Sequence, residues 1–395
     1  MGPRGTTTSL RPVGDAELPV ALAAALDGGA PIAPLPTDPV ERGRALQALH
    51  LDEAADPGAA VVVLSSGSTG EPKAVVLSAA AIRAGAEATH ARLGGPGHWL
   101  LPLPRHHVAG LMVLARAHLA GTTVVPLARD LADLPTADSP AGRRYLSVVP
   151  TQLVRALERP ALVSALAGLD AVLVGGGAVD ATVLERARAA GVPCVTTYGM
   201  SETCGGCVYD GVPLDRVDVA VDRDGSGDGR ISVRGPVLFS GYRGRPDLTA
   251  EVLGSGWFET ADLGAWATDP DGTRRLQVRG RVDDVVVSGG HNVDLAAVEH
   301  RAVAWPERGA AELVVVGVPH PEWGVEVVAV ADAPLAYDGL RSWVRAGLGA
   351  YAAPRRLVVL DRLPRTPSDK VDRRRLRSEL TGTKHESNPE TKKER

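Results

Sequence analysis

The sequence predicts an α/β protein with a large N-terminal domain and a small C-terminal α+β domain. Between residues 60 and 200, short apolar runs alternate with helix-like segments, which is typical of mostly parallel sheets flanked by helices. From about 204 to 280, short runs are separated by Asp-Gly turns, which indicates antiparallel hairpins in a β-barrel-like subdomain. A compact α+β pattern follows, and 395 residues suffice for two or three domains.

Charge and hydropathy exclude several classes of protein. A formal net charge of −4 gives no electrostatic indication of binding to nucleic acid or to an anionic membrane. The apolar run at 20–26 is too short to span a bilayer. It also follows Asp15 and Glu17, where a signal peptide would carry basic residues. We therefore expect a cytoplasmic protein with no nucleic-acid partner and no membrane span.

Cys194, Cys204 and Cys207 are too few for a disulfide framework, as expected in a reducing compartment. Cys204 and Cys207 have CxxC spacing, but no second pair or neighbouring histidine completes a zinc site. The cysteines could have a redox or metal role, or they could simply be small residues in a tight loop. We prefer the tight-loop interpretation.

Apolar periodicity places the elements of the large domain. Two helices are predicted near 16–26 and 39–50. The predicted strands are 60–64, 98–103, 122–127, 145–149, 170–174 and 193–197. The predicted helices between them lie near 78–92, 107–119, 151–158 and 180–190. Ligands bind beyond the carboxyl ends of parallel strands, so the polar motifs that follow these strands are expected to form the site.

The C-terminal domain is predicted from a second alternating pattern after Gly280-Arg281. Its predicted helices are 294–303 and 338–349, and its predicted strands are 312–318, 325–331 and 356–360. We place the N-terminal domain at 1–280 and the C-terminal domain at 281–380. The polar tail at 381–395 is predicted to be disordered.

The stretch VVVLSSGSTGEPK at 61–73 has the composition of a phosphate-binding loop. Gly67 and Gly70 let backbone N–H groups face one point, and Lys73 supplies a positive charge. The hydroxyl donors are Ser65, Ser66, Ser68 and Thr69. Because Pro72 precedes the lysine, this is not a Walker A loop. A flexible Ser/Gly surface loop is the alternative.

Two further motifs end predicted strands. Gly176 and Gly177 let the backbone approach a flat ligand closely, although an ordinary strand-to-helix turn has the same composition. The second motif is Tyr198-Gly199-Met200-Ser201-Glu202-Thr203. Its tyrosine can stack on a base, its threonine can donate to a phosphate, and Glu202 is a hard oxygen ligand suited to Mg²⁺. A solvated glutamate in a loop is the alternative.

Three more groups have the chemistry of a nucleotide or acid site. Asp262 follows the aromatic pair Trp257-Phe258 and can accept both hydroxyls of a ribose, or simply cap a turn. Outside the tail, the lysines of this Arg-rich chain are Lys73 and Lys370, which marks positions where arginine would fail. Arg105-His106-His107 precede an apolar helix and suit an anionic or aromatic acid, or form a polar helix start.

The loop at 61–73 and the YGMSET motif at 198–203 closely resemble signature motifs of the adenylate-forming superfamily, the acyl-CoA synthetases and their relatives. Those enzymes join a carboxylate to AMP and then pass the acyl group to a thiol. Further matches lie at 257–264, 280–284, 288–299 and 364–373, so the resemblance spans 61–373. It implies that ATP, Mg²⁺, coenzyme A and a small carboxylic acid are the partners.

The resemblance also implies roles for single residues. Glu202 would bind Mg²⁺, Thr203 would contact phosphate, and Lys370 would be the catalytic lysine, carried on a mobile C-terminal domain. Gly176, Gly177, Tyr198 and Gly199 would line the nucleotide site. Asp262 and Arg281 would bind the ribose, Ser288, Gly289 and Gly290 would build the thiol tunnel, and His107 would lie beside the acyl pocket. The short chain and its His step most resemble members that act on a keto-aryl dicarboxylate in menaquinone biosynthesis.

Two positions depart from the family pattern. Leu295 stands where a proline usually precedes a helix, and Asp369 replaces the glycine before the catalytic lysine. They motivate one rival, a non-catalytic nucleotide-binding protein with a degenerate site. The other rivals are a ligase for a different aryl or alkyl acid and a free-standing enzyme that loads a carrier protein. The sequence leaves the oligomeric state open, a homodimer included.

Overall fold

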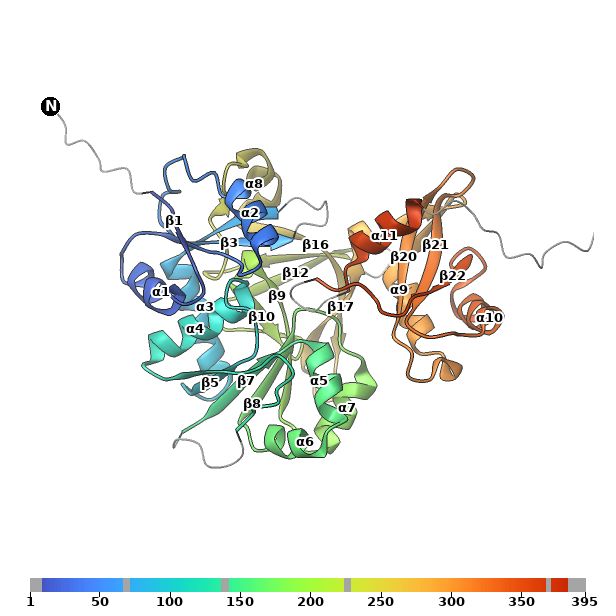
Figure 1. The fold of residues 1–395 in the computed structure, drawn as a ribbon, viewed down its shortest axis with the longest axis horizontal. Coiled ribbons are helices and arrows are strands. Elements are labelled where there is room, and N and C mark those ends of the chain that lie inside the picture. Colours follow the sequence, from blue (N-terminus) through green and yellow to red (C-terminus); the bar gives the residue numbers. More distant parts are fainter. Residues whose placement is uncertain (1–8, 67–71, 136–141, 224–228, 367–370, 383–395) are drawn as a thin grey trace, which may run out of the picture. The chain divides into compact units, whose positions relative to one another are not determined.

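The computed structural model describes residues 9–66, 72–135, 142–223, 229–366 and 371–382. The chain packs as two compact units (Figure 1). The first comprises Met1–Thr260 and Gly264–Gln277, and the second comprises Ala261–Leu263 and Val278–Arg395. Within the described residues, no helix combines the length and apolar character needed to cross a membrane.

The first sheet contains the strand that leads into the predicted phosphate loop. Its order is β1 (Arg11–Val13), β2 (Ile32–Pro34), β3 (Ala59–Ser66), β4 (Pro72–Ser78) and β14 (Gly241–Tyr242). The strands β1, β2 and β3 are parallel, whereas β4 is antiparallel to both β3 and β14. No strand was predicted between the strand at 60–64 and the helix near 78–92, but β4 lies there and pairs with β3 as an antiparallel hairpin.

Two helices accompany this sheet near the N-terminus. They are α1 (Leu18–Leu26) and α2 (Pro39–Ala48). The second helix begins where the Asp38 carboxylate accepts hydrogen bonds from the N–H groups of Val40 and Glu41. Such a cap satisfies donors that the first helical turn leaves free.

The second sheet has seven strands and contains the remaining predicted strands of the large domain. Its order is β11 (Val212–Pro213), β10 (Gly205–Tyr209), β9 (Cys194–Met200), β8 (Ala171–Gly175), β7 (Arg144–Val148), β5 (His98–Leu101) and β6 (Val124–Pro126). From β6 to β9 all neighbours are parallel, as predicted. The antiparallel subdomain starts at Asp218 and not near 204, because β10 and β11 extend this sheet.

Helices cover both faces of the seven-stranded sheet. They are α3 (Ala79–Arg92), α4 (Val108–Ala120), α5 (Pro150–Leu157), α6 (Pro160–Ala167) and α7 (Ala181–Ala189); α6 was not predicted. Alternate residues of β8 enter different cores, because side chains alternate along a strand. Leu173 packs in the core that α1, α3 and α4 share with the first sheet. Val172 and Val174 pack in the core beneath α5, α6 and α7.

A third, antiparallel sheet follows, as the Asp-Gly turns predicted. Its strands are β12 (Asp218–Arg223), β13 (Gly229–Arg234), β16 (Trp257–Thr268) and β15 (Leu253–Gly254), with β17 (Arg274–Arg281) paired to β16. The short helix α8 (Pro246–Val252) precedes β15. The hairpin of β12 and β13 pairs all six residues of each strand.

The second unit is a five-stranded sheet with helices on both faces. The strands are β19 (His291–Asp294), β18 (Val285–Ser288), β21 (Gly324–Ala331) and β20 (Leu313–His320), with β22 (Arg356–Val359) paired to β21. The helices are α9 (Leu295–Val303), α10 (Tyr337–Leu348) and α11 (Arg373–Gly382). Along β20, the side chain of Val315 packs in a core that includes residues of α9 and α10. The side chains of Val314 and Val316 pack in a second core that includes residues of α11.

The α+β pattern predicted for this region is confirmed, but two features were missed. The hairpin of β18 and β19 and the helix α11 were not predicted, and α11 reaches Gly382. The Asp294 carboxylate accepts from the N–H groups of Ala296 and Ala297. This cap starts α9 without the proline that Leu295 replaces. Most of the tail predicted to be disordered lies outside the described residues.

Candidate active site

The hairpin of β3 and β4 places Lys73 at the end that leads into the predicted phosphate loop. Lys73 lies opposite Ser65, and Pro72 lies opposite Ser66. The four central loop residues, Gly67, Ser68, Thr69 and Gly70, lie outside the described residues. Their part in phosphate binding therefore stays a prediction, while the two flanks of the loop are placed side by side.

The ends of β8 and β9 bring two of the predicted motifs together. The two strands are parallel, and Gly175 lies opposite Thr197. A Cβ on Gly175 would meet the Thr197 hydroxyl at 2.1 Å, so no side chain fits there. Gly176 has a φ of 79°, a conformation that favours glycine. The turn at Gly176 and Gly177 therefore follows β8 beside Tyr198 on β9.

The tip of the β9–β10 hairpin carries Glu202 and Thr203 in the short 3₁₀ turn η1 (Ser201–Thr203). The two strands approach so closely that a Cβ on Gly199 would lie 2.0 Å from the Gly205 carbonyl oxygen. The Thr203 hydroxyl donates to that carbonyl at 2.7 Å and accepts from the Met200 N–H at 2.9 Å. Thr203 is only 1% exposed. Its hydroxyl shapes the tip, and its predicted contact with phosphate stays a prediction.

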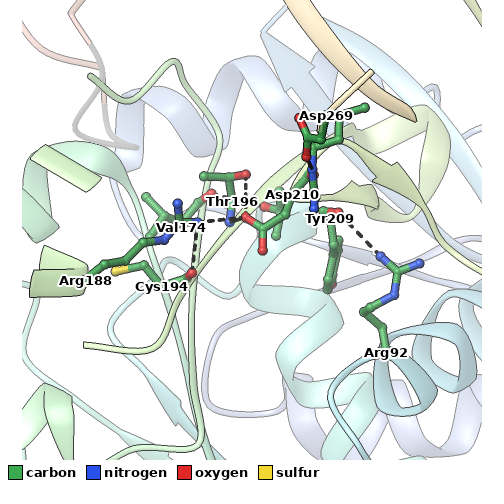
Figure 2. Close-up of polar contacts among 10 residues, drawn as sticks. Arg92, Val174, Arg188, Cys194, Thr196, Tyr209, Asp210 and Asp269 are labelled. Carbon is green, nitrogen blue, oxygen red and sulfur yellow. Dashed lines mark hydrogen bonds and ion pairs between the residues drawn. The ribbon is translucent and has the colours of Figure 1, made fainter. Parts of the chain in front are cut away.

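The base of the same hairpin is fixed by a polar network that sequence analysis missed (Figure 2). The Asp210 carboxylate accepts from the Thr196 N–H at 2.9 Å, the Thr196 hydroxyl at 3.0 Å and Arg188 at 3.1 Å. Arg275 donates to the Asp210 carbonyl and pairs with Asp269. The Asp-Gly step at Asp210 was the available sequence signal, because such steps mark tight turns.

A buried tyrosine joins Glu202 to Lys73. Glu202 is 8% exposed, and its Oε1 accepts a 2.8 Å hydrogen bond from the hydroxyl of Tyr242 on β14. The Lys73 ammonium lies 5.2 Å from the centre of the Tyr242 ring, within the range of a cation–π interaction. The Phe239 N–H also donates to the Glu202 carbonyl at 2.9 Å. Two residues predicted from separate motifs therefore share one neighbour.

The residues around Glu202 fit a magnesium ion that arrives with a nucleotide. Within the described residues, no group of three His, Cys, Asp or Glu side chains could hold a metal by itself. Mg²⁺ in nucleotide enzymes is usually held by one or two carboxylates together with substrate phosphates. One buried carboxylate that shares the neighbour Tyr242 with a lysine matches that donor set, so the structure is compatible with the predicted role of Glu202.

The predicted histidine step lies at the start of α4. His107 is the residue before the helix and makes no side-chain cap there. Its ring centre lies 4.2 Å from that of His106, and Arg105 pairs with Asp15 at 3.5 Å. Burial, the largest cause, lowers the pKa of His106 below its ordinary value. His106 is therefore neutral at neutral pH, whereas Arg105 carries a positive charge.

A buried basic cluster further along α4 was not predicted. Arg116 is 4% exposed, and its guanidinium lies 5.1 Å from the centre of the Trp99 ring. Burial and the charge of Arg116 lower the pKa of His90 to about 4. Among the described residues, Arg116 has no carboxylate partner, and Arg116 Nε, Trp99 Nε1 and His90 Nε2 have no hydrogen-bond partner. No periodic pattern in the sequence marks this cluster.

The CxxC cysteines are packing residues. Cys204 and Cys207 are both buried in the main core. Burial raises the pKa of each thiol to about 12, so thiolate, the reactive form, is scarce at neutral pH. Cys204 has a φ of 52° at the tight hairpin tip. The tight-loop interpretation is therefore supported over a redox or metal role.

In the second unit, two predicted ribose ligands meet. The buried Asp262 carboxylate accepts a 2.8 Å hydrogen bond from Arg281. Ser288 ends β18, and Gly289 and Gly290 form the turn into β19 with φ values of 57° and 82°. Ser288 is fully buried. Its predicted contact with a thiol cofactor stays a prediction.

The predicted catalytic lysine, Lys370, lies outside the described residues, but the segments on either side of its motif are anchored. Arg365 and Val371 form an isolated antiparallel bridge. The Arg373 guanidinium makes two hydrogen bonds to the Glu299 carboxylate, at 2.6 and 2.7 Å. Arg365 also pairs with Glu312. Both ends of the motif are therefore anchored to other residues of this unit.

Comparison with known proteins identifies the family of this chain. The family model described as AMP-binding enzyme matches residues 15–243, and the model of the AMP-binding enzyme C-terminal domain matches residues 297–370. A probable 2-succinylbenzoate–CoA ligase of Mycobacterium tuberculosis is 44% identical over 357 residues, which cover 87% of this chain and 90% of that protein. The chain belongs to the AMP-binding enzyme family.

Two solved structures from Bacillus subtilis are similar to most of the chain. The o-succinylbenzoate CoA synthetase in complex with the acyl-adenylate intermediate OSB-AMP is 27% identical, with a TM-score of 0.70 over 93% of this chain and 81% of that one. The same synthetase in complex with ATP and magnesium ion is 27% identical, with a TM-score of 0.68 over 91% of this chain and 81% of that one. The predicted fold class, an adenylate-forming α/β enzyme, is confirmed.

Proposed function

We propose that this chain is an ATP-dependent acid–CoA ligase that converts 2-succinylbenzoate to 2-succinylbenzoyl-CoA, with release of AMP and pyrophosphate. The observation that carries the proposal is the placement of Glu202 and Lys73 on one buried tyrosine. A carboxylate for Mg²⁺ and an ammonium for phosphate are the two charges that a metal–nucleotide complex requires. The family membership places this pair in an AMP-binding enzyme.

The reaction runs in two steps. In the first, a substrate carboxylate oxygen bonds to the α-phosphorus of ATP, and the bond to pyrophosphate breaks. In the second, the CoA sulfur bonds to the acyl carbon, and AMP leaves with the electron pair of the broken C–O bond. Mg²⁺, when bound at Glu202, neutralises phosphate charge.

The remaining predicted residues take the following roles in the proposal. Lys73 and the loop at 65–70 hold the phosphates, and Asp262 with Arg281 holds the ribose. Lys370 stabilises the charge that develops in the first step. Residues 281–380 form a domain that delivers Lys370 and then exchanges it for the thiol-binding segment at 288–290.

The substrate assignment is supported by the named relatives and by Arg105, which lies just before α4. 2-Succinylbenzoate carries two carboxylates, and activation consumes only one of them. Arg105 supplies positive charge for the other. A cytoplasmic location and a homodimer also belong to the proposal.

A pyrophosphate-release assay across a panel of aryl and alkyl acids, with and without CoA, tests the proposal. We expect release with 2-succinylbenzoate to exceed that with every monocarboxylate, and a thioester to form when CoA is added. Release with an acid but no thioester would favour an enzyme that loads a carrier protein. ATP binding without release for any acid would favour the non-catalytic rival.

A further inference from the structure

Tyr242 occupies an unusual position among the buried aromatic residues of the first unit. It is 6% exposed, and its hydroxyl and its ring face contact groups of opposite charge. The hydroxyl donates to the Glu202 carboxylate, and the ring lies under the Lys73 ammonium. Neither contact was predicted from the sequence, because Tyr242 lies outside both motifs.

The tyrosine is itself firmly held. On β14 it pairs with Val75 of β4, the strand that begins at Pro72 beside Lys73. Its N–H donates to the Thr249 hydroxyl at 2.9 Å, and its ring centre lies 4.9 Å from that of Phe239. A side chain fixed at backbone and ring can transmit a defined orientation to the groups that it touches.

The direction of the hydrogen bond follows from the chemistry of the two groups. A tyrosine hydroxyl carries its proton at neutral pH, whereas an ionised carboxylate can only accept a hydrogen bond. The Tyr242 hydroxyl therefore donates to Oε1. The described residues provide no hydrogen-bond partner for the second oxygen, Oε2, so one lone-pair face of the carboxylate is left for a cation.

We propose that Tyr242 is the positioning residue of the metal–phosphate site: its hydroxyl orients Glu202 for the divalent cation, and its ring holds Lys73 toward the nucleotide phosphates. This inference rests on the proposed function. The structural alternative is a core tyrosine whose hydroxyl merely satisfies a buried carboxylate. The two accounts differ in what loss of the hydroxyl does to metal affinity.

Tyr242→Phe removes the hydroxyl and keeps the ring. With Mn²⁺ as the probe and a non-hydrolysable ATP analogue present, we expect Mn²⁺ affinity, measured by electron paramagnetic resonance, to fall about tenfold, the scale of a lost hydrogen bond to a charged group. Affinity for the analogue without metal should change less than about twofold, because the ring still faces Lys73. Unchanged Mn²⁺ affinity would overturn the proposal.

Tyr209→Phe is the matched control. Tyr209 is also buried in this unit, and its hydroxyl lies 3.1 Å from the Thr89 hydroxyl, away from both charged groups. We expect this variant to lose stability without a change in Mn²⁺ affinity. If the two phenylalanine variants weakened Mn²⁺ binding equally, the effect would be one of general packing and the proposal would fail.

A double-mutant cycle separates positioning from packing. In Glu202→Gln the hydroxyl no longer orients a charged metal ligand, so adding Tyr242→Phe should weaken Mn²⁺ binding by less than about twofold. An undiminished tenfold loss in that background would contradict the proposal. Tyr242→Leu, which also removes the ring, should in addition weaken metal-free binding of the analogue. If the wild-type chain failed to bind Mn²⁺ with the analogue, the proposed function itself would be overturned.

Discussion

Glu202 is a buried carboxylate at a hairpin tip. Its environment explains why a substitution there can remove the negative charge without disrupting the fold. The Tyr242 hydroxyl can still donate to the amide oxygen of a glutamine at this position. The hairpin is held by contacts that do not involve the Glu202 side chain, such as that of Thr203 with Gly205. The fold therefore tolerates the loss of this charge.

We predict that Glu202→Gln lowers the rate of acyl-adenylate formation by about 10²-fold, because an amide is a poorer ligand for a hard cation. The measurement is pyrophosphate release over a range of Mg²⁺ concentrations. Glu158→Gln is the control, since Glu158 is an exposed partner of Arg186. Normal turnover in Glu202→Gln would remove this residue from the metal role.

His90 links stability to pH. Burial and Arg116 lower its pKa to about 4, whereas an unfolded chain binds this proton below about pH 6.5. Between about pH 4 and about pH 6.5 the unfolded state therefore binds more protons at this site than the folded state. The free energy of unfolding falls as the pH drops from about 6.5 to about 4. The predicted loss is up to about 3 kcal/mol.

Urea unfolding at pH 7 and pH 4.5 measures this effect. His90→Gln should reduce the difference between the two pH values, whatever its effect on stability at pH 7. His50→Gln, at an exposed histidine, should leave the difference unchanged. The same pH dependence in wild type and His90→Gln would show that His90 is not the titrating group.

The β9–β10 hairpin is the element on which the candidate site depends. Its tip carries Glu202, and its base is fixed by Asp210 (Figure 2). Between them, a β-bulge lies between Gly206 and Val208. A hairpin held at its base and closely packed at its tip leaves little freedom for the Glu202 carboxylate.

We expect Asp210→Ala to lower the free energy of unfolding by about 2–3 kcal/mol. The variant loses the bonds to Thr196 and Arg188 and leaves a polar group of Thr196 unpaired. Asp218→Ala is the control, because Asp218 is an exposed partner of Arg234, and such pairs contribute about 1 kcal/mol or less. Urea denaturation compares the two variants, and equal losses would contradict the assigned role of the Asp210 network.

For the chain as a whole, the proposal requires that residues far apart in the sequence act in different steps. Lys370 belongs to the first step, so its loss should affect adenylation and spare thioester formation. We predict that Lys370→Ala slows adenylation by about 10²–10³-fold, the scale for one preorganised electrostatic group. The same variant should convert synthetic acyl-adenylate and CoA to thioester at nearly the wild-type rate. Equal losses in both half-reactions would argue against domain alternation.

Sequence patterns predicted most of the elements because apolar periodicity is local. Strands such as β8, with side chains in two cores, keep the continuous apolar run that marks buried parallel strands. The pairing of β3 with β4 was missed because a turn and a strand-to-helix loop share the same composition. The sheet to which a strand belongs depends on contacts that no local window contains.

Those residues of the candidate site that belong to a local sequence motif could be predicted from the sequence. Glu202 and Lys73 were each predicted from the residues around them. Tyr242, which joins them, was not, because it reaches the site through the pairing of β14 with β4. Asp210 and Arg116 were missed for the same reason: their importance lies in partners that the fold brings together.

Single-turnover rapid quench with 2-succinylbenzoate, ATP and Mg²⁺ but no CoA tests the central claim most directly. The account predicts that acyl-adenylate accumulates to about one equivalent per active site, matched by pyrophosphate. Subsequent addition of CoA should convert it to 2-succinylbenzoyl-CoA with release of AMP. Formation of thioester without a preceding acyl-adenylate, or release of ADP in place of AMP, would contradict it.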